Sequence, residues 1–187
     1  MKKLPHEGHR TAAWAGGSTT QVYIFPEGAD YGKRDFLFRV SSARVDCQRS
    51  DFTPLPGVER HIMVLEGALH LLYEGYGEKD LAVLEQDTFS GGWHTVSLGQ
   101  AQDFNLMLRE GTKGCIQGLR LKAGESHTFS FFPGEQGVLL LYRGSARAGG
   151  LALGEWDALH CAGEGEVQVE GEEDCILALA RVQMQQS

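Results

Sequence analysis

The stretch LAVLEQDTF, residues 81–89, aligns without gaps on LALGEWDAL, residues 151–159. Two flanking matches keep the same order: VLEG (64–67) with LYRG (141–144), and DFNLML (103–108) with DCILAL (174–179). Three ordered matches indicate an internal duplication, and repeats of this kind decide the architecture of a chain before its local structure is assigned. We therefore expect two copies of one structural module.

The module itself is expected to be all-β. Short runs of β-branched, aromatic and leucine residues alternate with glycine-containing turns, and helical periodicity is scarce. In each copy a hairpin is followed by a Gly turn and an Asp before the next strand, a pattern typical of a cupin half-barrel. The sequence predicts a bicupin with two jelly-roll-like barrels, over residues 1–118 and 119–187, the second a degenerate repeat. The alternative is a single irregular sandwich.

Composition excludes several classes of function. The net charge of −8 over 187 residues argues against binding to nucleic acid, which requires clustered Lys and Arg. No apolar run reaches the length of a membrane span, and the first ten residues are too polar for a secretory signal. The four cysteines form no CxxC pair, so we expect reduced thiols in a cytoplasmic protein.

Several separated segments carry a family resemblance. They are WAGGSTT (14–20), DFLFRVSSA (35–43), FT (52–53) with LPGVER (55–60), LEG (65–67) and DFNLM (103–107). On these segments the chain resembles the HutD/Ves family. The resemblance implies a bicupin fold and a link to histidine utilisation and stress responses, without defining a ligand or a reaction.

A metal centre is not expected. Cupin metal sites require two His close together on one strand, a Glu soon after and a third His from a later strand. Here His61 precedes Glu66, but Met63 stands where the second His would be, and His94 alone imitates the later His. The sequence therefore predicts no metal and no cofactor.

Two arginines are candidate anion ligands. Arg39 and Ser41 share one face of a predicted strand at 36–43, and a guanidinium beside a hydroxyl suits a carboxylate or phosphate. The alternative for Arg39 is an ion pair with Asp103. Arg60 follows a Pro-Gly turn, either as a second anion contact or as an arginine at the barrel rim with its head in water.

A third predicted strand has a polar face. Asp103, Asn105 and Met107 alternate with apolar residues that must pack in a core, so their face is expected to line a pocket. In the gapless alignment Asn105 is aligned with Ile176. The second copy is therefore the more apolar one at this position, and we expect the polar site in the first copy. Trp14 and Thr19 belong to a Gly-rich segment that is either a flexible turn or a flap over the ligand.

These residues lead to three hypotheses. The first is a metal-independent bicupin that binds a small anionic metabolite through Trp14, Thr19, Arg39, Ser41, Arg60, Asp103, Asn105 and Met107, in a regulatory or buffering role. The second is an isomerase or hydrolase acting on a related carboxylate, with an acid–base pair near His61, Glu66 or His94. The third is a scaffold without ligand. A homodimer is compatible with each of them.

Overall fold

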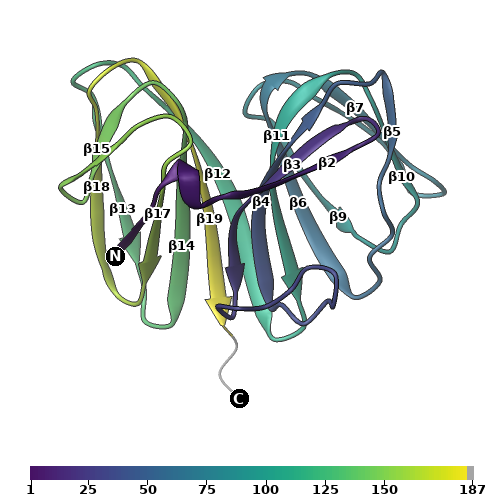
Figure 1. Cartoon of the computed structure of the whole chain (residues 1–187), viewed down its shortest axis with the longest axis horizontal. Helices are drawn as coiled ribbons and strands as arrows, with labels where there is room; N and C mark the ends of the chain where they lie inside the picture. The colour runs from purple at the N-terminus through teal and green to yellow at the C-terminus, as the bar shows by residue number, and fades with distance from the viewer. Residues whose placement is uncertain (185–187) are drawn as a thin grey trace. The chain divides into compact units, whose positions relative to one another are not determined.

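The computed structural model describes residues 1–184, and these residues form nineteen β-strands and one short 3-10 helix. They divide into two compact units (Figure 1). The N-terminal unit is Arg10–Thr112, and the C-terminal unit joins Met1–His9 to the chain from Lys113 onward. Among residues 1–184 no helix combines the length and hydropathy needed to cross a membrane.

The N-terminal unit contains two sheets. The six-stranded sheet has the order β2 (Arg10–Trp14), β3 (Gly17–Phe25), β4 (Phe38–Val45), β11 (Ala101–Arg109), β6 (Val58–Gly67) and β9 (Gln86–Ser90). The four-stranded sheet has the order β5 (Arg49–Asp51), β10 (Thr95–Leu98), β7 (Leu69–Tyr73) and β8 (Gly77–Leu81).

The C-terminal unit repeats this plan. Its five-stranded sheet has the order β1 (Lys2–Leu4), β17 (Ala158–Ala162), β14 (Glu135–Arg143), β19 (Cys175–Met184) and β12 (Thr112–Leu121). Its four-stranded sheet has the order β13 (Ser126–Phe131), β18 (Gly165–Gly171), β15 (Ala146–Ala148) and β16 (Leu151–Leu153). The helix η1 (His6–Gly8) follows β1.

The strand orders confirm the predicted all-β duplication. β4-β11-β6-β9 of one unit corresponds to β12-β19-β14-β17 of the other, and β5-β10-β7-β8 corresponds to β13-β18-β15-β16. The two sheets of each unit remain separate, so each module is a two-sheet sandwich rather than one closed barrel. All neighbouring strands with a defined register pair antiparallel, which allows the short turns that the glycines mark.

Matching irregularities fix which residues of the two units correspond. Gly67 and Gly144 both have positive φ, and a Cβ at either would collide with a backbone carbonyl oxygen, that of Gln100 just before β11 or that of Asp174 just before β19. The backbone amide of Leu84 donates a hydrogen bond to the carbonyl oxygen of Val64. In the other unit, the amide of Trp156 donates the equivalent bond to the carbonyl oxygen of Leu141. The same steric constraint therefore requires a glycine at Gly67 in one unit and at Gly144 in the other.

The boundary between the units differs from the expected one. Residue 118 lies inside β12, whereas the division falls at Thr112. The first residues also belong to the later unit, because β1 pairs antiparallel with β17, Lys3 opposite Leu159. Nothing in the local sequence of residues 1–9 indicates this long-range pairing.

Alternation along two central strands separates the core from a polar face. Phe38 and Val40 of β4, with Phe104 and Leu106 of β11, are fully buried. Their neighbours of opposite parity, such as Arg39, point to the interior between the two sheets, because successive side chains of a strand face opposite ways. Part of that interior is filled by an apolar cluster that includes Ile62, Leu71 and Phe89. The remainder is a cavity.

Candidate functional site

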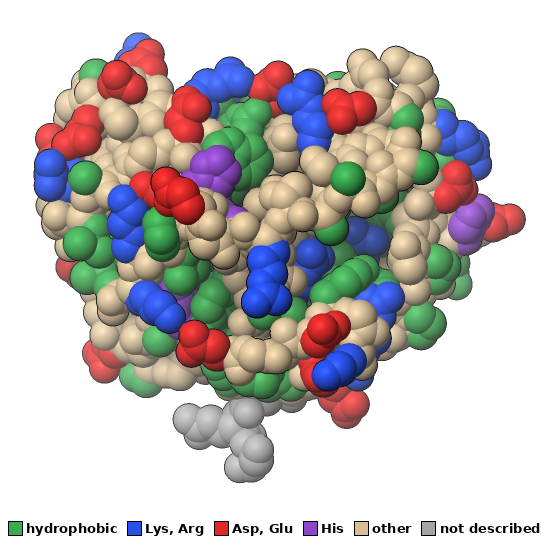
Figure 2. Space-filling model, in the orientation of Figure 1, with side chains coloured by type: hydrophobic (Ala, Val, Ile, Leu, Met, Phe, Trp, Pro, Cys, Tyr) green, Lys and Arg blue, Asp and Glu red, His purple; other side chains and the backbone are tan. Residues whose placement is uncertain are grey.

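The cavity has a volume of about 400 Å³ and lies within the N-terminal unit. All eight residues that the sequence predicted as ligand contacts line it: Trp14, Thr19, Arg39, Ser41, Arg60, Asp103, Asn105 and Met107. Ten further residues complete the lining: Arg10, Ala12, Ala13, Tyr31, Ala43, Val45, Ser50, Asp51, Phe52 and Thr53. The space-filling view shows Lys or Arg side chains deep in a hollow of the surface (Figure 2).

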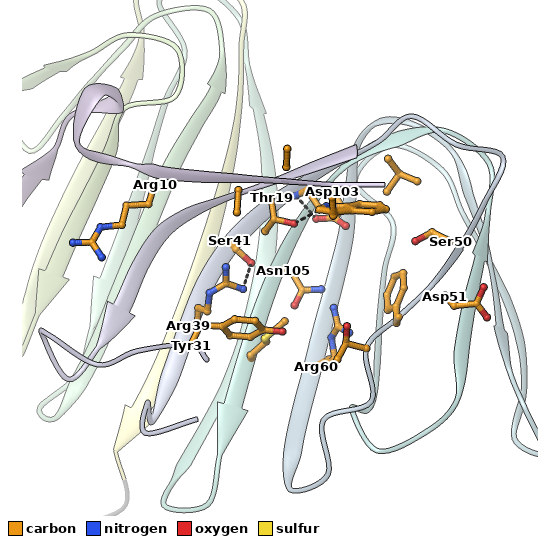
Figure 3. A pocket seen from close by; sticks show the side chains of 18 residues that line it. Arg10, Thr19, Tyr31, Arg39, Ser41, Ser50, Asp51, Arg60, Asp103 and Asn105 are labelled. Atoms are coloured by element: carbon orange, nitrogen blue, oxygen red, sulfur yellow. Dashed lines mark hydrogen bonds between the residues drawn. The ribbon is translucent and has the colours of Figure 1, made fainter. Parts of the chain in front are cut away.

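The register of three adjacent strands brings the two arginines to the same level of the sheet. Met107 of β11 lies opposite Arg39 of β4 on one side and opposite Arg60 of β6 on the other. Asn105, two residues earlier, lies opposite Ser41. Figure 3 shows the side chains of Arg39, Asn105 and Arg60 projecting from these strands into the same space.

Arg39 is held in place by three neighbours. Its Nε donates a hydrogen bond to Gln21 Oε1 at 2.9 Å, and its Nη1 donates to Ser41 Oγ at 3.2 Å. The guanidinium carbon lies 4.3 Å from the ring centroid of Tyr31, a cation–π contact. Burial lowers the pKa of Arg39 below its usual value. The ion pair with Asp103 that was the alternative for Arg39 is not found among residues 1–184.

Arg60 is buried without a counter-ion in contact. Its guanidinium lies 4.7 Å from the ring of Phe52 and 5.4 Å from that of Phe89, and its Nε has no acceptor among the described residues. Burial lowers the pKa of Arg60 to about 10. Only 9% of the residue is exposed, so Arg60 is not a rim arginine with its head in water. The flanking rings instead orient a desolvated cation toward the cavity.

Asp103 adds a buried carboxyl group to the same wall. It is 3% exposed, and its Oδ1 accepts a hydrogen bond from the Ala43 amide at 2.9 Å. Burial raises the pKa of Asp103 to about 6, while the Ala43 amide and the charges of Arg60 and Arg39 act in the opposite direction. Burial is the larger effect, so this carboxyl group titrates near neutral pH.

Asn105 is the residue with the clearest unmet bonding capacity. It is 3% exposed, and neither its Oδ1 nor its Nδ2 has a hydrogen-bond partner among the described residues. A buried amide without partners is costly, because both its donor and its acceptor have lost water. A polar molecule in the cavity would supply both missing bonds.

The Gly-rich segment forms one edge of the cavity. Trp14 ends the edge strand β2, whose neighbour in the sheet is β3, and its Nε1 donates a hydrogen bond to Thr19 Oγ1 at 3.2 Å. The Trp14 ring also occupies the space that a Cβ on Gly16 would need, which explains the glycine. β2 is exposed along its whole length, so this edge of the cavity borders solvent.

The histidines and the glutamate proposed for an acid–base pair lie elsewhere. His61 bonds to Glu59 and Thr88, each at 2.9 Å, and His94 bonds to Glu74 at 2.8 Å. Neither histidine lines the cavity, nor does Glu66. His61 faces away because Arg60 and Ile62, its neighbours in β6, point inward. An enzyme in this cavity would have Asp103 as its buried acid–base group.

Sequence reasoning missed part of the lining. Ala43 could have been included, because it shares the strand face of Arg39 and Ser41. Phe52 and Thr53 belong to a segment quoted for the family resemblance, but nothing in that segment indicates which way they point. Tyr31 carries no local signal, because it lies outside any strand and reaches Arg39 through tertiary folding.

In the described part of the C-terminal unit, the residues that correspond to Asp103 and Asn105 are apolar. Val64 corresponds to Leu141, and the strand registers then align Asp103 with Leu177 and Asn105 with Leu179. Both leucines belong to the packed core of that unit. The gapless alignment of Asn105 with Ile176 was therefore three residues out of register, although its conclusion that the polar wall lies in the first copy agrees with the structure.

Solved structures of other proteins have the same two-unit, all-β fold. A bacterial pirin from Escherichia coli, YhhW in complex with nickel(II), superposes with a TM-score of 0.74 at 11% identity, over 99% of both chains. Quercetin 2,3-dioxygenase from Acinetobacter baumannii gives 0.69 at 10% identity, over 98% of this chain and 86% of the other. The predicted bicupin fold is thus confirmed.

The family follows from the sequence itself. The HutD family model matches residues 6–179, and the chain belongs to this family. HutD from Pseudomonas fluorescens SBW25 superposes with a TM-score of 0.78 at 20% identity, over 99% of both chains. A conserved protein of unknown function from Pseudomonas aeruginosa PAO1 gives 0.82 at 22%, over 97% and 98%. A search of curated proteins found no match to this sequence.

The cavity of this chain does not fit a transition-metal ion. Its lining contains no His or Cys, and its carboxylates are Asp51 and Asp103. In the described part of the chain no three His, Cys, Asp or Glu side chains gather as a metal site would require. Two cationic guanidiniums in the wall would also repel a metal ion.

We expect protein purified without chelators to contain no stoichiometric iron, manganese, nickel or zinc. The physical reason is the donor set of the cavity, which offers guanidinium and amide groups where a transition metal needs imidazole or thiolate. Elemental analysis is the measurement. About one equivalent of any of these metals per chain would contradict the expectation.

Proposed function

We propose that this HutD-family protein binds a small anionic metabolite in the cavity of its N-terminal unit, as a cytoplasmic regulatory or buffering protein of amino-acid catabolism. The observation that carries the proposal is Arg60, a buried cation that has no ion pair among the described residues and lines an open cavity. Buried charges are ordinarily paired, since an unpaired one costs several kcal/mol. An anion in the cavity would be the missing partner.

Three neighbouring groups support an anion of limited size. Arg39 is oriented by Gln21 and Ser41, so its guanidinium is preorganised for a carboxylate or phosphate. Asn105 offers one donor and one acceptor. The rings of Tyr31, Phe52 and Trp14 supply apolar contact for the rest of the molecule. A cavity of about 400 Å³ falls within the range of small-molecule sites.

The family link to histidine utilisation guides the choice of test compounds. We expect one or more small carboxylates, drawn from a panel with formate and the intermediates of histidine breakdown, to raise the melting temperature. A ligand at 100 times its dissociation constant adds about 2.7 kcal/mol to the free energy of unfolding. Arg39→Ala should abolish the shift, because it removes an oriented guanidinium from the cavity.

Arg44→Ala is the matched control for this measurement. Arg44 belongs to the same strand as Arg39 but has the opposite parity, and it forms an exposed ion pair with Asp46. The control should keep the full shift. If no carboxylate in the panel moves the melting curve of the wild-type protein, the anion site is contradicted.

An enzyme acting on a related carboxylate is the second candidate, and Asp103 is the observation that favours it. Its buried carboxyl group, with a pKa of about 6, could accept or return a proton beside a bound anion. Incubating the best ligand of the panel with the protein, followed by mass spectrometry of the ligand, separates the two functions. An unchanged ligand supports binding alone.

A further inference from the structure

Asp103 lines the same cavity as the two arginines. Its Oδ1 is occupied by the Ala43 amide at 2.9 Å, and no residue of the described chain bonds to its other carboxyl oxygen. Arg39 comes from β4 and Arg60 from β6, the two strands that flank β11. The carboxyl group is 3% exposed, so its charge depends strongly on these neighbours.

Few other ionisable groups can respond at this site. The remaining lining residues with titratable or charged side chains are Arg10, Tyr31 and Asp51. The side chain of Asp51 is about half exposed. Its Oδ1 lies 3.4 Å from Arg49 Nη2 and 3.4 Å from His94 Nε2, so solvent and these two side chains stabilise its carboxylate. Asp103 is the buried carboxyl group of the cavity wall, and its raised pKa of about 6 lets it gain a proton near neutral pH.

We propose that an anion enters this cavity together with one proton, which Asp103 takes up from solvent. The inference rests on the proposed anion site and adds how that site is regulated. Without an anion in the cavity, the positive charges of Arg39 and Arg60 both favour the charged form of Asp103. A bound anion would neutralise these cations, add a like charge beside the carboxylate and displace water, and all three changes favour the neutral acid.

The coupling has a defined sign. Below the pKa of free Asp103, about 6, the carboxyl group is already protonated and affinity for the anion is at its maximum. As the pH rises through that pKa, binding has to draw a proton from solvent, and affinity falls. The decrease approaches tenfold per pH unit until the pKa of Asp103 in the complex is reached. The site would thus retain its ligand better under mildly acidic conditions.

Formate is a suitable probe, because an ordinary carboxyl group with a pKa near 4 stays ionised across this pH range. The carboxyl carbon of Asp103 is followed by nuclear magnetic resonance in ¹³C-aspartate-labelled protein, and its signal is assigned by its loss in Asp103→Asn. We expect saturating formate to raise the apparent pKa of Asp103. The dissociation constant of formate, from amide shifts, should increase as the pH is raised from about 5.5 to 8.

Asp103→Asn makes the test independent of a structural role. The asparagine keeps an acceptor for the Ala43 amide and imitates the protonated acid, so formate affinity should lose its pH dependence. At pH 8 the variant should bind formate more tightly than the wild type, by about tenfold or more. A merely structural aspartate would instead give weaker binding at every pH. Asp51→Asn changes the other carboxylate that lines the cavity, and it should leave the pH dependence of formate affinity unchanged.

The outcomes separate the two proposals. Formate that binds wild-type protein with one dissociation constant at all pH values, without moving the Asp103 titration, overturns proton coupling and leaves the anion site standing. If formate binds at no pH and no carboxylate of the panel raises the melting temperature, the anion site is overturned, and the coupling with it.

Discussion

Arg60→Met is expected to abolish carboxylate binding and at the same time to make the protein more stable. Burial lowers the pKa of Arg60 to about 10, well below the usual value for arginine, so its charge opposes folding by about 3 kcal/mol at neutral pH, where arginine is charged in both states. Methionine keeps a long apolar stem against Phe52 and Phe89. Replacing a buried charge with an apolar side chain of similar length commonly stabilises a protein by about 1–4 kcal/mol.

The affinity for a carboxylate should fall, because Arg60→Met removes the buried cation that would pair with the ligand. Loss of a buried charged partner costs about 2–5 kcal/mol, so affinity for the best carboxylate should fall at least about 100-fold. Denaturant unfolding and calorimetric titration measure the two effects on one protein sample.

Arg44→Met is the matched control, because Arg44 is exposed and lies outside the cavity. We expect it to change stability by no more than about 0.5 kcal/mol and to leave binding intact. An Arg60→Met protein that is less stable than the wild type would show that Arg60 serves the fold. A stable variant with normal affinity would place the anion elsewhere.

Asn105→Leu is expected to weaken binding by about 1–3 kcal/mol while the fold survives and gains stability. The amide of Asn105 has neither of its atoms bonded within residues 1–184, so leucine removes a desolvation penalty of about 1–3 kcal/mol without breaking a hydrogen bond. The C-terminal unit already has Leu179 at the corresponding position. Titration of the best ligand and thermal unfolding of the variant check both parts.

Leu179→Asn is the reciprocal control. It places an amide in a packed apolar core, so it should destabilise the protein by at least about 2 kcal/mol and create no second binding site. Unchanged affinity in a folded Asn105→Leu protein would remove Asn105 from the site. A variant that fails to fold would show that the amide has a structural partner.

The sequence by itself determined the all-β duplication and the polar strand faces that line part of the cavity. The reason is local, because strand side chains alternate with a period of two regardless of what surrounds them. Once 36–43 and 103–107 are strands, Arg39 must share a face with Ser41, and Asp103 with Asn105 and Met107. Apolar neighbours on the opposite face then direct these polar groups inward. All of them line the cavity.

Only the tertiary structure decided what surrounds these groups. The alignment of Asn105 with Ile176 failed because it followed residue similarity, whereas the hydrogen-bond register makes Leu179 the counterpart of Asn105. Likewise β1 joins the later unit through pairing with β17, across more than 150 residues of chain. The burial of Arg60 between Phe52 and Phe89, and the pKa of Asp103 near 6, arise from desolvation. Desolvation depends on every element that packs around a group, so no local pattern encodes it.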